Sequence, residues 1–277
     1  MNGRLRSLLL ATTATTSALI LIGIYTAAAG AGLTCEARWP LCDGAVFGLF
    51  PANWPSFIEW FHRLIAMVAG FLVIGAAYGA WRWESDRRVR LSVTLALVLF
   101  PVQALLGAGT VLQYTFVYLT AHLSTALVIF ASLALATLWS YGDDAVSVAR
   151  VRYALLAVVG AVPVMLALSP GLFFVHTPVV QVVYNAAGLL AFTGFVVVAA
   201  WSALLSAKGR LDALRVVSSV GAVVVGLQLL VGRFVYTELI QLLDAATLVA
   251  TAVLAICALT LASRVEPRRP RLAERTS

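Results

Sequence analysis

Residues 116–139 read FVYLTAHLSTALVIFASLALATLW, an apolar run without a single Asp, Glu, Lys or Arg. A helix needs about 20 mostly apolar residues to cross a bilayer, and backbone groups in lipid must be hydrogen-bonded within the segment. The run therefore predicts a membrane-spanning helix. It also contains His122, an ionisable residue of a kind that is uncommon inside such helices.

Seven further runs resemble it in length and polarity. The eight predicted spans are 8–31, 57–80, 91–112, 116–139, 152–173, 178–204, 212–235 and 239–262. The 277-residue chain is 62% hydrophobic and 11% charged, whereas soluble chains are roughly 45–50% apolar. The first run follows Arg4 and Arg6 as a signal peptide would, but it is too long for one, so we expect it to be retained. The fold class expected is all-α and integral to the membrane.

The net charge of +7 reflects membrane topology. If the N-terminus is cytoplasmic, 16 of the 19 Lys and Arg residues fall on the cytoplasmic side, and the exceptions are Arg38, Arg63 and Arg233. The positive-inside rule predicts this bias for short loops. We therefore expect a multi-pass protein of the cell membrane with both termini in the cytoplasm. The basicity requires no nucleic-acid partner.

The second half of the chain repeats the first. Residues 59–66 (EWFHRLIA) align with 181–188 (QVVYNAAG), 102–107 (VQALLG) with 227–232 (LQLLVG), and 121–126 (AHLSTA) with 243–248 (LDAATL). An even number of spans in each unit gives parallel repeats related by an axis along the membrane normal. We therefore expect two pseudo-repeated four-helix bundles, residues 1–142 and 143–277.

Two of the three histidines, His62 and His122, lie inside the second and fourth predicted spans. Each is about seven residues, or roughly 10 Å of helix, below the outer end of its span. Equal depth on two helices of one bundle allows both imidazoles to reach one metal. Three interpretations stay open: axial ligands of one haem, hydrogen-bonding structural residues, or another metal site or proton relay.

Glu59 precedes His62 by three residues and so lies one turn away on the same helix face. It is a candidate acid or base at a site near the outer face. Alternatively, the Glu59 side chain reaches outer water or pairs with Arg63. Arg63 has two candidate partners, Glu59 and a haem propionate.

The second half lacks the histidine pair. Tyr184 stands at the position of His62, and Asp244 at that of His122. These residues cannot form a bis-imidazole site. His176, at the boundary between the fifth and sixth spans, corresponds to no ligand position and is interpreted as a loop residue.

Cys35 and Cys42 lie in the long first outer loop, about residues 33–56. Disulfides persist on the oxidising side of a membrane. A disulfide between them is therefore the main prediction. The alternatives are two free thiols or a redox-active pair.

Together these residues resemble the haem A synthase family. The matching motifs are Gly32-Leu-Thr-Cys35 and Trp39-Pro-Leu-Cys42 in the loop, Glu59-x-x-His62-Arg63, Gln103-x-x-x-Gly107, and His122. The resemblance covers the first four spans well and the second half only faintly. It implies eight helices in two bundles and the oxidation of a ring methyl of haem O to the formyl of haem A, for use by terminal oxidases.

The resemblance also implies residue roles. His62 and His122 would hold the haem substrate, Glu59 would act at that site, and Cys35 and Cys42 would form a disulfide. The expected partners are haem O, haem O synthase, a terminal oxidase and an electron donor that the sequence does not identify.

Members of the family of this length commonly carry a second histidine pair that holds a haem b. Tyr184 and Asp244 replace it here, which argues for one haem site per chain. Two alternative functions are a single-haem b-type electron carrier and a non-catalytic haem-binding assembly factor.

Overall fold

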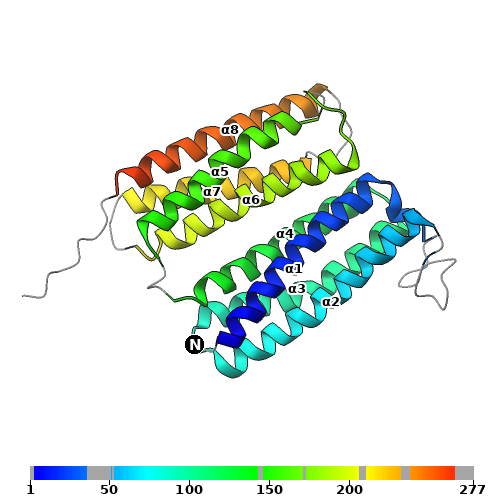
Figure 1. The fold of residues 1–277 in the computed structure, drawn as a ribbon, viewed down its shortest axis with the longest axis horizontal. Helices are drawn as coiled ribbons and strands as arrows, with labels where there is room; N and C mark the ends of the chain where they lie inside the picture. The colour runs from blue at the N-terminus through cyan, green and yellow to red at the C-terminus, as the bar shows by residue number, and fades with distance from the viewer. Residues whose placement is uncertain are drawn as a thin grey trace, which may run out of the picture.

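The computed structural model describes residues 3–35, 51, 53–142, 146–170, 173–205, 210–231 and 238–265. These residues form helices and no strand (Figure 1). The helices are α1 Gly3–Ala28, η1 Ala31–Leu33, α2 Trp54–Trp83, α3 Arg87–Leu112, α4 Phe116–Trp139, α5 Val148–Leu168, α6 Pro178–Ser202, α7 Arg210–Val231 and α8 Glu238–Ser263. All but the short η1 are long and apolar enough to cross a membrane. The predicted fold class, all-α with eight spans, is confirmed, and the chain is a multi-pass integral membrane protein.

Polar side chains fix where five of the helices begin. The side chains of the N-cap residues accept a hydrogen bond from a backbone N–H in the first turn, a strongly preferred way to start a helix. These residues are Asn53, Asp86, Thr115, Ser147 and Thr177. The caps set the depth of polar residues farther along. His62 lies about 12 Å from the start of α2, and His122 about 9 Å from the start of α4.

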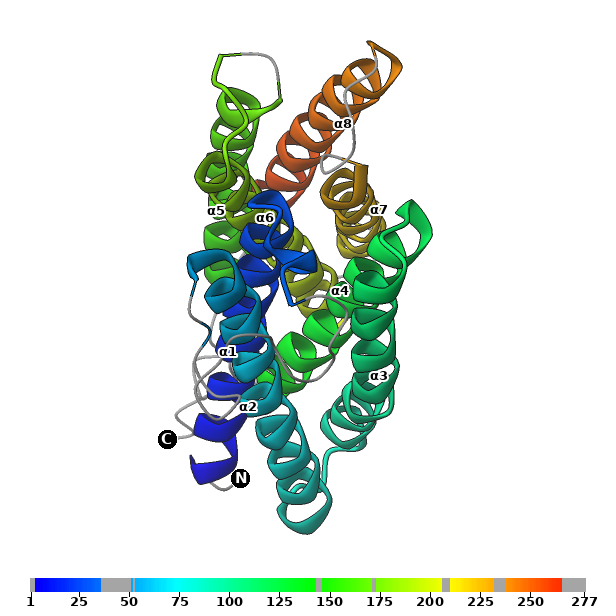
Figure 2. The same cartoon turned by 90° about the vertical axis from the view of Figure 1, so that its right-hand side faces the viewer.

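Each half of the chain forms a ring of four helices. In the first, α1 packs on α2 and α4, and α3 completes the ring by packing on the same two helices. In the second, α5 packs on α6 and α8, and α7 lies between those two. In Figure 2 the helices of the second bundle lie above those of the first. Helices α2 and α4 are therefore diagonal partners, as are α6 and α8. The boundary at 142/143 stays a prediction.

An arginine contact recurs in both rings. Arg6 Nε of α1 donates to the carbonyl of Ser140 at the end of α4, at 2.9 Å. Arg152 Nε of α5 donates to the carbonyl of Ala262 at the end of α8, at 3.2 Å. The last carbonyls of a helix have no partner within the helix, so each arginine supplies one. Ser140 and Ala262 are 122 positions apart, the same offset as in the sequence repeat.

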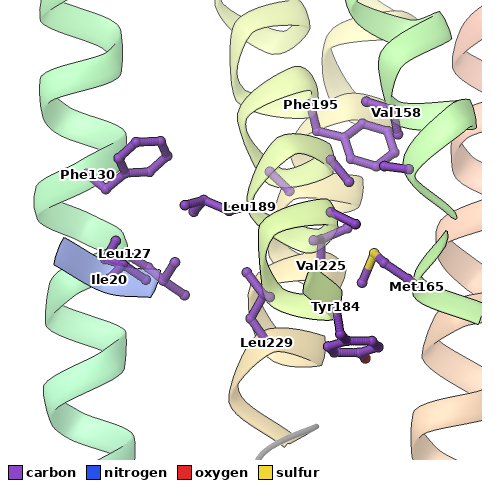
Figure 3. Packing of buried hydrophobic residues seen from close by; sticks show 14 of the residues in the cluster. Ile20, Leu127, Phe130, Val158, Met165, Tyr184, Leu189, Phe195, Val225 and Leu229 are labelled. Atoms are coloured by element: carbon purple, nitrogen blue, oxygen red, sulfur yellow. The ribbon is translucent and has the colours of Figure 1, made fainter. Parts of the chain in front are cut away.

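One apolar cluster joins the two rings. Ile20 of α1 and Leu127 and Phe130 of α4 belong to the same buried cluster as Leu189 and Phe195 of α6 (Figure 3). Helices α1, α4 and α6 form most of this interface. The first bundle thus turns its α1–α4 side toward the second bundle.

Candidate functional site

Glu59 lies in the second turn of α2 and is only 3% exposed. Its Oε2 accepts a hydrogen bond from the backbone N–H of Cys35 at 2.9 Å and one from Thr34 Oγ1 at 3.5 Å. Both donors come just after η1, in the connection between α1 and α2. Glu59 therefore ties this connection to the helix that carries His62.

Arg63 pairs with Glu59. Its Nη2 donates to Glu59 Oε1 one turn along α2, and its side chain is 14% exposed. Of the two partners that the sequence left open for Arg63, the structure shows the carboxylate. A buried charge without a partner is strongly destabilising, so this pair accounts for how Glu59 is accommodated at such low exposure.

His62 lies on α2 with its imidazole against α1. A Cβ atom at Gly23 would be 2.9 Å from His62 Cε1. Real Cβ atoms essentially never come so close, so a larger residue at this position would force the ring to shift. The spacing of sequence motifs did not reveal this contact, because Gly23 lies on a different helix.

His122 lies on α4 in a matching arrangement with α3. A Cβ atom at Gly107 would be 3.1 Å from His122 Cε1. Gln103, one turn before Gly107, places its Nε2 3.3 Å from His122 Nε2. Gln103 Oε1 is buried and has no hydrogen-bond partner among the described residues. This acceptor is the kind of buried polar atom for which a bound molecule would supply a partner.

The two histidines fit a metal that brings its own equatorial ligands. They project from diagonal helices at similar depth, each beside a glycine of a neighbouring helix. No group of three or more His, Cys, Asp or Glu side chains in the described residues could hold a bare metal ion. Two imidazoles alone suit the axial positions of a haem, which is held by histidine in many proteins.

The equivalent positions of the second bundle are hydrogen-bonded to each other. Tyr184 Oη donates to Asp244 Oδ1 at 3.1 Å, and Ser169 Oγ donates to Asp244 Oδ2 at 2.5 Å. Gln228 Nε2 donates to Tyr184 Oη at 2.7 Å and also to Asp244 Oδ1. Tyr184 and Gln228 are fully buried, and Asp244 is 4% exposed. A network from α5 to α8 therefore lies where the first bundle has its histidines.

The glutamine contact is common to both halves. Gln103 touches His122 as Gln228 touches Asp244. The sequence repeat aligned these residues in pairs, but it did not predict that they meet. Ser169, which ends α5, could not be identified from the repeat.

His176 lies in the connection before α6, as expected for a loop residue. Its ring is edge-on to Tyr184, with 6.2 Å between ring centroids. Burial lowers the pKa of His176, and the nearby charge of Asp244 offsets part of that effect. His176 thus covers the polar network of the second bundle.

Only one of the predicted disulfide residues can be placed. Cys35 is fully buried, and Cys257 is an exposed free cysteine. Cys42 lies outside the described residues, so its pairing with Cys35 stays a prediction.

Comparison with known proteins bears on the first bundle most directly. A family model described as a cytochrome oxidase assembly protein (COX15-CtaA) matches residues 6–173. This region contains Glu59, His62 and His122, together with α5 and all of the first ring except the first three residues of α1.

Two kinds of relatives are similar to parts of the chain. It is 33% identical to the Heme A synthase of Bacillus licheniformis over 148 residues, which cover 52% of this chain and 48% of that protein. It is 31% identical to the Heme A synthase of Alkalihalophilus pseudofirmus over 127 residues, 45% of this chain and 42% of that protein. It is also 41% identical over 123 residues to the Protoheme IX farnesyltransferase of Halobacterium salinarum, 44% of this chain and 27% of that protein. The matches thus span between about a quarter and about half of these relatives.

Proposed function

Because the chain belongs to the cytochrome oxidase assembly protein family COX15-CtaA, we propose that it is a membrane oxidoreductase that converts haem O to haem A. In this reaction a porphyrin methyl becomes a formyl, so two hydrogen atoms leave the carbon and one oxygen atom is added. The similarity to two proteins named Heme A synthase supports this choice of reaction.

The observation that carries the proposal is the pair of imidazoles on diagonal helices with a buried carboxylate one turn from one of them. His62 and His122 would hold the iron of haem O in the first bundle. Gly23 and Gly107 leave room for the two imidazole rings. The ring positions are defined because each histidine is part of a long helix and packs against a neighbouring helix.

Glu59 manages protons at the reacting methyl. Its carboxylate is shielded from water and held by the Cys35 N–H, by Thr34 and by Arg63. A carboxylate in such a site can accept a proton as the methyl carbon is oxidised, or stabilise positive charge that develops there. Arg63 keeps Glu59 oriented and supplies the countercharge.

The second bundle holds no haem in this proposal. Its hydrogen-bonded network at Tyr184 and Asp244 offers no imidazole, and it holds α5 to α8 together without a cofactor. Its contribution is to cover the α1–α4 side of the first bundle.

The topology and partners complete the proposal. Both termini are cytoplasmic and the haem site lies toward the outer face, where Cys35 and Cys42 form a disulfide in the loop before α2. Haem O synthase supplies the substrate, and a terminal oxidase takes the product. An unidentified redox partner exchanges electrons with the site.

Two other functions can be distinguished from the oxidation of haem O. A single-haem electron carrier or a non-catalytic haem-binding assembly factor would use His62 and His122 but would leave the porphyrin unchanged. Farnesyl transfer is not carried over from the Protoheme IX farnesyltransferase of Halobacterium salinarum, because the similarity covers only 27% of that protein.

The test is the chemical identity of haem in cells that make haem O but lack their own haem A synthase. Expression of the chain should yield haem A in the extracted haem, identified by mass. The variants His62→Ala and His122→Ala should yield haem O only. Bound haem that stays haem O in the wild type would reject the oxidoreductase and leave the carrier or assembly function.

A further inference from the structure

A cavity of about 390 Å³ lies between the two bundles, at the end of the molecule where α1 begins and α4 ends. Residues of α1, α4, α5 and α6, together with Tyr141 just after α4, line it. They are Thr13, Ala134, Thr137, Leu138, Tyr141, Arg150, Thr193, Val197 and Trp201. In Figure 1, α1 and α4 lie beside α6. This cavity is far from the histidines, because Ala134 is twelve residues, or about 18 Å of helix, beyond His122 on α4.

The lining residues form stripes that run along the helices. On α6, Thr193, Val197 and Trp201 are spaced by four residues and therefore lie above one another on one face. Ala134 and Leu138 are likewise spaced by four residues on α4, and Tyr141 follows three residues later, just after that helix. The α6 stripe is about 12 Å long. The cavity is thus a groove along the membrane normal, the direction in which lipid acyl chains run.

The groove changes from apolar to basic and aromatic toward the helix ends. Arg150, Tyr141 and Trp201 lie at this end, where α4 and α6 finish and α5 begins. Arg6 adds a second guanidinium, 5.3 Å from the centre of the Tyr141 ring. Trp and Tyr prefer the level of lipid headgroups, and basic pockets between transmembrane helices bind anionic headgroups.

We propose that this groove binds one anionic phospholipid. The phosphate lies near Arg150 and Arg6, and one acyl chain follows the stripe from Trp201 to Thr193. Because the lining comes from α1 and α4 on one side and α5 and α6 on the other, the bound lipid joins the two bundles.

The hydrogen bonds of the threonines keep the part of the groove away from Arg150 apolar. The hydroxyls of Thr13 and Thr193 donate to carbonyls of their own helices, at 2.9 and 2.7 Å, and Thr137 is bonded to Thr13 at 2.8 Å. The threonines thus present an effectively apolar wall, which suits an acyl chain.

The experiment compares phosphatidylglycerol with phosphatidylcholine on the purified full chain in detergent. Native mass spectrometry counts the lipids bound, and thermal unfolding measures the stabilisation. Phosphatidylglycerol should bind as one tight adduct and raise the unfolding temperature. Arg150→Gln should weaken its affinity by about five-fold, the effect expected of one basic residue near an anionic headgroup. Val197→Trp should fill the groove and abolish the tight adduct.

Matched controls separate the groove from general surface charge and from the lipid-facing surface. Arg82→Gln removes an exposed arginine at the end of α2, and Val223→Trp adds the same bulk on an exposed face of α7. Both should keep wild-type binding. Equal affinity for the two lipids, an equal loss in Arg82→Gln and Arg150→Gln, or an unchanged adduct in Val197→Trp would each overturn the proposal. So would an isoprenoid quinone that co-purifies with the wild type in the groove and is lost in Val197→Trp.

Discussion

Tyr184 Oη donates a hydrogen bond to Asp244 Oδ1 across 3.1 Å, and these two residues occupy the positions of His62 and His122 in the repeat. Ser169 and Gln228 donate two more hydrogen bonds to the same carboxyl group. The second bundle is therefore closed by its own side chains at the level where the first has its histidines.

The first prediction is one haem per chain at most. His62→Ala or His122→Ala should remove the absorbance of a low-spin haem with two imidazole ligands. Tyr184→Phe and Asp244→Asn should keep it, and Tyr184→Phe should cost about 0.5–2 kcal/mol of stability through the lost hydrogen bond. Haem and protein are quantified on the same purified sample. Two haems per wild-type chain would refute the account of the second bundle.

The sequence predicted the spans well because bilayer thickness sets the length of an apolar run. The fourth span, 116–139, matches α4, Phe116–Trp139. The fifth was predicted to reach residue 173, but α5 ends at Leu168. Ser169 precedes Pro170 there, and a residue before proline is disfavoured in helical conformation. The first span was predicted to begin at residue 8, whereas α1 begins at Gly3. Hydropathy indicates the length of the apolar run, and a helix can extend beyond that run.

The site was predictable in its residues but not in its contacts. Glu59, His62 and His122 stand out because ionisable groups are rare in spans. The sequence left two partners open for Arg63, Glu59 and a haem propionate. Which of them it contacts depends on how the side chains pack. Gly23 carried no signal, since its importance arises only when α1 meets α2.

The second prediction concerns the two glycines beside the histidines. Gly23→Ala places a Cβ atom 2.9 Å from His62 Cε1, and Gly107→Ala places one 3.1 Å from His122 Cε1. The imidazole must move away from the new methyl group, and returning it to the position that binds haem would cost about 1–3 kcal/mol of overpacking. Haem affinity should therefore fall roughly five- to hundred-fold. Gly75→Ala is the control, because the nearest side-chain atom there is 3.8 Å away. Haem titrations measure the affinities, and an unchanged affinity in Gly23→Ala would show that His62 does not hold the haem in this position.

The third prediction is a pH dependence of stability that arises at His176. Burial lowers the pKa of His176 below its ordinary value of 6.5, although Asp244 offsets part of the shift. As pH falls through 6.5, the unfolded chain takes up a proton at His176 before the folded chain does. Stability should therefore decrease below pH 6.5 and be insensitive to this group above it. His176→Gln should flatten the fall in unfolding temperature between about pH 6.5 and pH 5. Parallel curves for the variant and the wild type would contradict this.

The fourth prediction concerns the cysteines. In denatured protein without reductant, a thiol reagent should label Cys257 alone, and after reduction it should label all three cysteines. Peptide mapping should join Cys35 to Cys42. Labelling of Cys42 before reduction would rule out the disulfide and leave the free-thiol alternative.

The fifth prediction addresses the central claim, that the first bundle oxidises haem O and does not merely bind it. An electron carrier needs the two imidazoles but has no use for Glu59, a buried carboxylate whose presence in a membrane helix is costly. Glu59→Gln keeps the size of the side chain and an acceptor for the Cys35 N–H, while it removes the group that titrates. Arg63→Gln is the comparison variant, because it also breaks the ion pair but keeps the carboxyl group of Glu59.

The decisive measurement is made on Glu59→Gln and wild type in cells that make haem O. The haem spectrum reports binding, and the mass of the extracted haem reports conversion. Glu59→Gln should bind haem through His62 and His122 with the wild-type spectrum, and the extract should contain haem O or a partly oxidised hydroxymethyl form in place of haem A. Formation of haem A by Glu59→Gln at the wild-type rate would contradict the role of Glu59.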